Sequence, residues 1–248
     1  MIDILLQHRT IRKYKSTPID KTIVEKIVQS AIRGSNTGNM QLYSIIITSE
    51  PQIKQQLWEV HFKQNMVLQA PIIMTFVADI NRFHKWCELN NAGTAYDNFL
   101  WFYNASIDAT IAAQNACIAA ESFNLGICYL GTTTYNARKI IQILDLPKGV
   151  VPVTSIVVGH PNENPPLTER LPTNSVVFWE KYSDYSNEQI IDYFKEKDNS
   201  EQAKMLIEQN GTDNLAQVFT QKRYKKQDNV YFSNEFLDVL KEQGFMNQ

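Results

Sequence analysis

Residues 107–136, which read IDATIAAQNACIAAESFNLGICYLGTTTYN, decide the fold of this chain. The pattern over 106–123 predicts a long helix with alanine at positions 109, 112, 113, 116, 119 and 120. Small residues around almost the whole circumference let neighbouring helices approach closely. Gly126 then ends the helical pattern, residues 127–130 form a short strand, and a polar Gly-Thr turn follows. We therefore expect a central helix that is also shared with a second subunit.

Shorter patterns on both sides of this stretch predict further elements. A helix begins after Asp20, which is a suitable N-cap with Ile19 and Val24 placed as a hydrophobic staple, and Gly34 stops it. Strands are expected at 43–48, 72–78 and 153–158, and the second is apolar enough to be buried on both faces. A further helix is expected at 137–144.

The composition changes near residue 182. We interpret residues 1–182 as the core, and the polar stretch 183–248 as an extension of the same domain that packs on the core or on a partner subunit. Helical patterns recur in this extension at 188–195 and 234–243.

Hydrogen-bond donors alternate near the start of the chain, in His8-Arg9-Thr10-Ile11-Arg12. If this segment is extended, the two-residue period of a strand places His8, Thr10 and Arg12 on one face. An imidazole, a hydroxyl and a guanidinium that converge in this way suit a phosphate dianion.

Composition excludes several classes of protein. The formal net charge of −2 argues against a nucleic-acid-binding protein, and the longest apolar run, 70–78, is about half the roughly 20 residues of a membrane-spanning helix. The first residues have no basic leader, so we expect no signal peptide. Three cysteines without metal-ligand spacing indicate reduced thiols in a cytoplasmic protein.

The usual catalytic and nucleotide-binding motifs are missing from the sequence. No Gly-x-Gly-x-x-Gly follows a predicted strand, and there is no Walker-type Gly-Lys-Ser/Thr, no nucleophile elbow and no zinc spacing. His84 and Cys87 have no second Cys/His pair, so we expect no metal site. What remains are polar residues that can hold a ligand whose own atoms carry the reaction, as in flavin enzymes.

In their order and spacing, several blocks resemble the flavin-dependent nitroreductase superfamily, specifically its NADPH-preferring, oxygen-insensitive nitroreductase and flavin reductase branch. The N-terminal block is residues 8–12. The others are Gln69-Ala70-Pro71, residues 76–79 with 81–82, residues 113–116 with 119–122, Leu125-Gly126, residues 129–131, Leu146-Pro147, residues 157–161 and Arg170-Leu171-Pro172.

The resemblance implies an α+β fold with a central mixed β-sheet flanked by helices, and an intertwined homodimer with two FMN sites at its interface. It implies NAD(P)H as the co-substrate and ping-pong hydride transfer to nitroaromatics, quinones or flavins, with no catalytic side chain. The FMN-binding residues that it implies are His8, Arg9, Thr10, Arg12 and Arg170 at the phosphate, and Asn36, Thr37, Gln41, Gln69, Leu130, Gly131 and Thr132 along the rest of the cofactor. Thr168 stands where the family often has lysine, which weakens the phosphate site.

The sequence leaves several alternatives open. The chain could be a dedicated flavin or quinone reductase, or a flavin-binding protein without turnover. Neither the physiological electron acceptor nor the choice between NADPH and NADH can be read from the residues. The basic cluster Lys222–Lys226 could bind the 2′-phosphate of NADPH or could simply be solvated.

Overall fold

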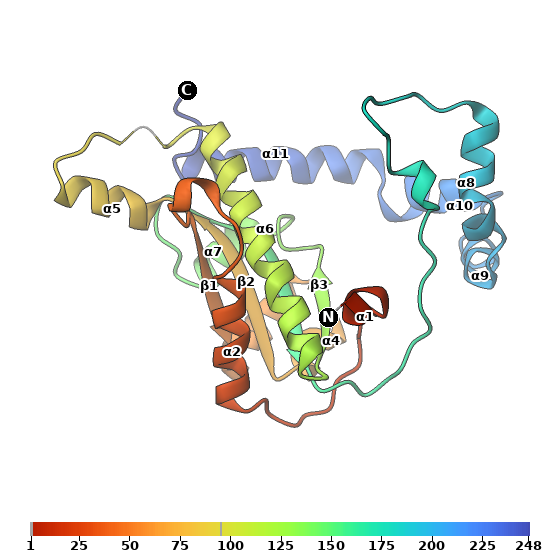
Figure 1. Ribbon diagram of the computed structural model, residues 1–248, viewed down its shortest axis with the longest axis horizontal. Coiled ribbons are helices and arrows are strands. Elements are labelled where there is room, and N and C mark those ends of the chain that lie inside the picture. The colour runs from red at the N-terminus through yellow and green to blue at the C-terminus, as the bar shows by residue number, and fades with distance from the viewer. Residues whose placement is uncertain (1, 95) are drawn as a thin grey trace. The chain divides into compact units, whose positions relative to one another are not determined.

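The computed structural model describes residues 2–94 and 96–248, which form two compact units (Figure 1). The first unit runs from the N-terminus to Pro166 and includes Ser233–Gln248, and the second comprises Leu167–Phe232. The first holds a β-sheet covered by helices, which confirms the predicted α+β class. No helix within the described residues is long and apolar enough to cross a membrane.

The sheet of the first unit has four strands in the order β1-β2-β4-β3. They are β1 (Tyr43–Thr48), β2 (Ile72–Asp79), β3 (Gly126–Leu130) and β4 (Val150–Gly159), so all four predicted strands are confirmed. Every residue of β2 is buried, as its apolar sequence predicts. The three ladders are antiparallel, and among the described residues parallel pairing is limited to an isolated bridge between Thr10 and Ile127. The expected mixed sheet is therefore mixed only at this edge, where the N-terminal segment runs beside β3.

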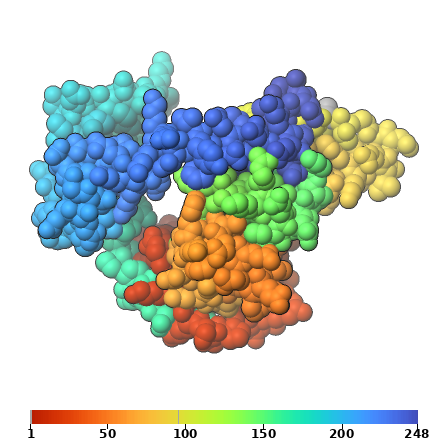
Figure 2. Space-filling model, turned by 180° about the vertical axis from the view of Figure 1, so that it is seen from behind, coloured from red at the N-terminus to blue at the C-terminus, as the bar shows by residue number. Residues whose placement is uncertain are grey.

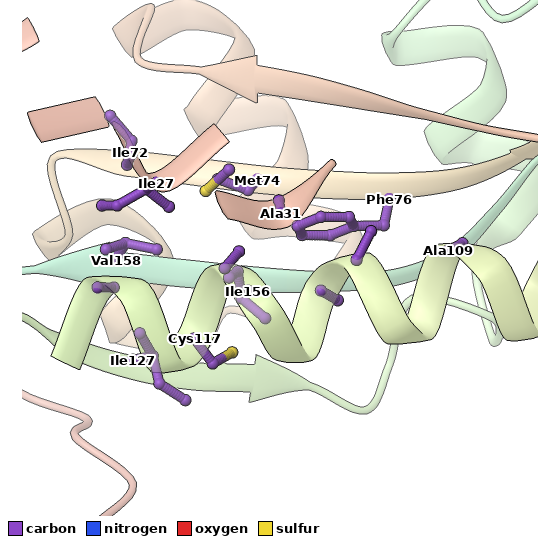
Figure 3. Close-up of a cluster of buried hydrophobic side chains, with 14 of the residues drawn as sticks. Ile27, Ala31, Ile72, Met74, Phe76, Ala109, Cys117, Ile127, Ile156 and Val158 are labelled. Carbon is purple, nitrogen blue, oxygen red and sulfur yellow. The ribbon is translucent and has the colours of Figure 1, made fainter. Parts of the chain in front are cut away.

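Helices α2 (Lys21–Ala31) and α6 (Phe99–Ser122) lie side by side on one face of the sheet (Figure 1). Alanines of α6 pack against the sheet and α2 in a buried cluster with large side chains such as Met74, Phe76 and Ile156 (Figure 3). Ala109, Ala113, Ala116 and Ala120 are completely buried. The alanines of α6 thus allow it to pack closely against α2 and the sheet of the same chain.

The ends of these two helices refine the predictions. The Asp20 side chain caps α2 by accepting a hydrogen bond of 2.7 Å from Thr22 N, as expected. Helix α6 begins at Phe99, seven residues before the predicted start, after an Asn98 cap. Gly34 has a further role, because a Cβ there would lie 2.8 Å from Ile111 Cγ2 of α6. Glycine at this position lets the chain pass close to α6 as it leaves α2.

The other face of the sheet is covered by α3 (Pro51–Val60), α4 (Asn65–Gln69) and α7 (Ala137–Ile143). Figure 2 shows this side, with α3 and α4 in orange. The C-terminal residues belong to the same unit, since Val239, Leu240 and Phe245 are buried with Leu42 and Ala137. Two further helices, α1 (Ile2–Leu6) and α5 (Asn81–Leu89), and the short helix η1 (Thr37–Asn39) complete the first unit.

The second unit is helical. It contains η2 (Thr173–Ser175), α8 (Asn187–Asn199), α9 (Glu201–Asn210), α10 (Leu215–Gln217) and the π-helix η3 (Val218–Arg223), while α11 (Lys226–Glu242) begins there and continues into the first unit. A capping box of Ser186 and Gln189 starts α8. The two helices expected in the extension correspond to α8 and α11, although both are longer than predicted.

Candidate functional site

The N-terminal segment is extended along the outer edge of β3, which meets the condition on which the alternation of its donors depends. Ile11 N donates a 2.9 Å hydrogen bond to Ile127 O, and Lys15 N donates to His160 O at the same distance. Ile11 is buried against Gly126, where a Cβ would lie 2.6 Å from the Ile11 side chain. Because successive side chains alternate, the buried Ile11 sets Thr10 and Arg12 on the opposite side.

The donors of this segment differ in how far they are already engaged. His8 Nδ1 lies 2.6 Å from Glu121 Oε1, and Arg9 Nη1 donates to Asn164 Oδ1 at 3.1 Å. Arg9 Nε is buried without a hydrogen-bond partner among the described residues. The side chains of Thr10 and Arg12 likewise make no hydrogen bond to the part of the chain that the structure describes. The segment therefore holds donors that an anionic ligand could use.

One carboxylate, that of Glu163, fixes the backbone of the same segment. Glu163 Oε1 accepts hydrogen bonds from the main-chain N–H groups of Arg12, at 2.5 Å, and Lys13, at 3.0 Å. This contact leaves the Arg12 guanidinium exposed and directs Glu163 to the backbone. Sequence reasoning did not identify Glu163, because only the fold brings it beside residues so distant in the chain.

Gln69 joins this group from the end of α4. Its Oε1 accepts a 3.4 Å hydrogen bond from Tyr14 N, so the amide nitrogen of the side chain stays available. The turn that carries Gln69 is held by the buried Lys54, whose Nζ donates to Leu68 O at 3.1 Å and to Ala70 O. Burial lowers the pKa of Lys54 below its usual value. The structure thus brings Gln69 to the predicted phosphate segment.

Asn36, Thr37 and Gln41 form a second group, in the loop between α2 and β1. Thr37 donates to Asp108 Oδ1 through its N–H at 2.9 Å and its hydroxyl at 3.2 Å. Gln41 N donates to Asn36 Oδ1 at 3.2 Å, and Gln41 has a positive φ of 53°. No hydrogen bond within residues 2–94 and 96–248 links this loop to residues 8–12. Within one chain the two groups are therefore not joined directly by a hydrogen bond.

Asp108 was missed by sequence reasoning, although it left a signal. It is the only carboxylate between positions 99 and 120, a stretch that contains no other charged side chain. The side chain is 1% exposed, and its Oδ2 has no hydrogen-bond partner among the described residues. Burying a carboxylate costs free energy unless it accepts hydrogen bonds. The two hydrogen bonds from Thr37 therefore hold the loop against Asp108.

Leu130, Gly131 and Thr132 form a third group, at the end of β3. Leu130 is buried, while Gly131 is exposed and a Cβ built on it would meet no atom within 4 Å. The space beside this turn is therefore open to a ligand. Thr132 Oγ1 lies 2.7 Å from Nδ1 of His61, the residue that follows α3.

His61 is a titratable residue that sequence reasoning did not identify. Its side chain is completely buried, and its Nε2 has no partner among the described residues. Burial lowers the pKa of His61 from 6.5 to about 4, because the charged imidazolium is poorly solvated there. His61 is therefore neutral near pH 7.

Arg170 lies in the second unit. Its Nη1 donates to Thr168 Oγ1 at 2.8 Å, to Thr168 O at 3.3 Å and to Glu169 O at 3.1 Å. The residue that replaces the family's lysine thus accepts a hydrogen bond from Arg170. The expected role of Arg170 at a phosphate stays a prediction.

Comparisons with known proteins agree over most of the chain. The profile of the Nitroreductase family matches residues 5–160. An NADPH-dependent oxidoreductase of Staphylococcus epidermidis is 31% identical over 211 residues, covering 79% of this chain and 84% of that protein. A Bacillus subtilis protein named FMN reductase (NADPH) is 29% identical over 256 residues, covering 98% of this chain and 97% of its own. A crystal structure from Bacteroides fragilis, described in general terms as an oxidoreductase, has a TM-score of 0.97 at 42% identity and covers 99% of this chain and 100% of that one.

Proposed function

Because the chain belongs to the nitroreductase family, we propose that it binds FMN and uses it to pass hydride from NADPH to an organic acceptor. The chain is an NAD(P)H-dependent flavin oxidoreductase. The observation that carries the site assignment is the extended N-terminal segment, which bridges to β3 at Thr10 and whose Tyr14 N–H, two residues after the donors of 8–12, donates to Gln69.

The donors of the first group suit the FMN phosphate. This group carries about −1.5 to −2 charges at neutral pH and three acceptor oxygens. The exposed guanidinium of Arg12 would supply charge and the Thr10 hydroxyl a further hydrogen bond. Arg9, whose Nε is buried without a partner among the described residues, is assigned to the same phosphate on the family pattern. His8 would contribute the ring nitrogen that does not face Glu121. We assign Arg170 to the same phosphate on the family pattern.

Gln69 and the other two groups, the loop of 36–41 and the turn of 130–132, suit the rest of the cofactor. The free amide nitrogen of Gln69 can donate to the flavin, and Asn36, Thr37 and Gln41 carry the amides and hydroxyls for the ribityl chain or the ring. The turn of Leu130, Gly131 and Thr132 adjoins open space at Gly131, and we assign main-chain N–H groups of this turn to negative charge on the reduced ring. Bound FMN would supply the hydride chemistry itself, so no side chain needs to act as an acid or a base.

We also propose that the functional unit is a homodimer with its FMN sites at the interface. Helix α6 presents an exposed apolar face, on which Phe99, Leu100, Tyr103 and Ile107 are 46%, 61%, 56% and 41% exposed. Such a face is typical of a subunit interface. An interfacial site would also let residues of two chains reach one cofactor. The extension 183–248 would pack on the core or on the partner.

The location and the acceptor belong to the same proposal. Three buried cysteines, none of them in a disulfide among the described residues, suit the reducing cytoplasm. Nitroaromatics, quinones and free flavins are the acceptors we propose, and the Bacillus subtilis relative's name favours a flavin among them. Comparing kcat/KM across the three classes with NADPH distinguishes a broad reductase from a dedicated flavin reductase. A ping-pong cycle predicts parallel double-reciprocal lines, and intersecting lines would contradict it.

A further inference from the structure

Two side chains of the segment that follows α3 converge on one hydroxyl in the turn after β3. His61 Nδ1 lies 2.7 Å from Thr132 Oγ1, and Gln64 Nε2 lies 3.4 Å from the same oxygen. Thr132 is half-buried and follows Gly131, beside which the space is open. The direction of each hydrogen bond decides what the Thr132 hydroxyl can offer a ligand.

The orientation of the Gln64 amide is fixed by a second contact. Its Nε2 donates a 3.0 Å hydrogen bond to the main-chain oxygen of His61. Turning the amide over would place two acceptor oxygens against each other, so the nitrogen must face this carbonyl. The same nitrogen is then a donor to Thr132 Oγ1.

The tautomer of His61 follows from its burial. If Nδ1 accepted from Thr132, the single ring proton would be on Nε2, which is buried without a partner among the described residues. Orphaned buried N–H groups are rare and costly. The favoured tautomer therefore carries the proton on Nδ1 and donates it to Thr132 Oγ1.

With both lone pairs of Oγ1 accepting, the Thr132 hydroxyl can act only as a donor, and its proton meets no acceptor within the described residues. We propose that Thr132 donates this hydrogen bond to an acceptor atom of the flavin ring, a carbonyl oxygen or a ring nitrogen, and that His61 is the positioning residue that fixes its direction. This inference rests on the proposed function and adds to it a side-chain donor that the family pattern, which gives main-chain N–H groups here, does not supply.

A fixed donor at this place has a specific consequence for the cofactor. Reduction places negative charge on the flavin ring, and a hydrogen bond to a charged acceptor is stronger than one to a neutral acceptor. Thr132 should therefore bind the reduced ring more tightly than the oxidised ring. The quantity that reports its role is the ratio of the two dissociation constants, which a structural role of Thr132 would leave unchanged.

The test compares Thr132→Val with Thr134→Val, which removes a hydroxyl from the same turn. The dissociation constants of oxidised and reduced FMN are measured for each full-length variant, together with the midpoint potential of the bound flavin. For Thr132→Val we expect the ratio of reduced to oxidised dissociation constants to rise about tenfold, which is a fall of about 30 mV for a two-electron couple. Thr134→Val should match the wild type. An unchanged ratio in Thr132→Val, or equal changes in both variants, would overturn the inference.

His61 is tested by a matched pair. Asparagine can place an amide N–H near the position of Nδ1, whereas leucine has a similar size and no donor. We expect His61→Asn to keep the wild-type ratio and His61→Leu to move it about threefold in the direction of Thr132→Val. Equal ratios in the two His61 variants would overturn the role given to His61. A wild-type protein that binds no FMN would instead overturn the proposed function, and this inference with it.

Discussion

Replacing His61 by asparagine should remove a specific pH dependence of stability. His61 is completely buried, and burial lowers its pKa from 6.5 to about 4. The unfolded chain exposes the imidazole, which then takes up a proton near its ordinary pKa. Protonation therefore favours unfolding, so the stability that the neutral side chain contributes is present above pH 6.5 and is lost as the pH falls toward 4.

The size of this effect follows from the two pKa values. At about 1.4 kcal/mol per pKa unit, the difference between 6.5 and about 4 corresponds to about 3 kcal/mol. Most of it is lost early in the titration, and at pH 5 the wild type should have lost about 2 kcal/mol relative to a protein that cannot titrate at this site. His61→Asn supplies that reference, because asparagine has no ionisable group.

The assay is urea unfolding of wild type and His61→Asn at several pH values between 7 and 4, with the same excess of FMN throughout. Every other titrating group is common to the two proteins, so it cancels in the difference between their unfolding free energies. That difference should shift by about 2 kcal/mol in favour of the variant between pH 7 and pH 5. A difference that stays constant with pH would refute the neutral, buried state of His61.

Three further predictions concern other parts of the site. Arg12→Ala should weaken FMN binding by roughly 1.5–3 kcal/mol in a fluorescence titration, as expected for the loss of a charge-assisted hydrogen bond. The control Lys13→Ala should leave the binding free energy within about 0.5 kcal/mol of the wild type, and equal effects of the two variants would remove Arg12 from the phosphate site. Lys54→Met should lower the free energy of unfolding in urea by about 1–3 kcal/mol, because two main-chain carbonyls lose their donor. The control Lys63→Met, at an exposed position, should change it little, and a larger loss for Lys63→Met than for Lys54→Met would contradict this. Ile107→Asp on the apolar face of α6 should shift sedimentation from dimer to monomer, and a variant that remains dimeric would place the interface elsewhere.

Much of the fold could be predicted because its signals are local. The apolar run of β2 and the alanines of α6 each indicate in their own sequence that they are buried. The Asp20 cap accepts a hydrogen bond from a main-chain N–H only two residues away. The early start of α6 was missed because residues 99–103, FLWFY, lack alanine and are mostly aromatic, a composition that gives weak helix propensity. Tertiary packing of Phe102 compensates for that weakness.

The contacts that shape the site could not be predicted, because they join residues far apart in the chain. Asp108 meets Thr37, and His61 meets Thr132, each across 71 positions. Neither pair has a spacing or a motif that marks it. Buried polar groups must find partners, but only the fold decides which partners they find.

The binding of FMN and its reduction by NADPH can both be read from the absorption spectrum of the purified protein, recorded before and after anaerobic addition of NADPH. We expect a yellow protein that releases FMN on denaturation, and whose flavin absorption bleaches with NADPH and returns when a quinone or a nitroaromatic is added. A protein that stays colourless when FMN is supplied, or a bound flavin that NADPH and NADH both fail to bleach, would contradict it.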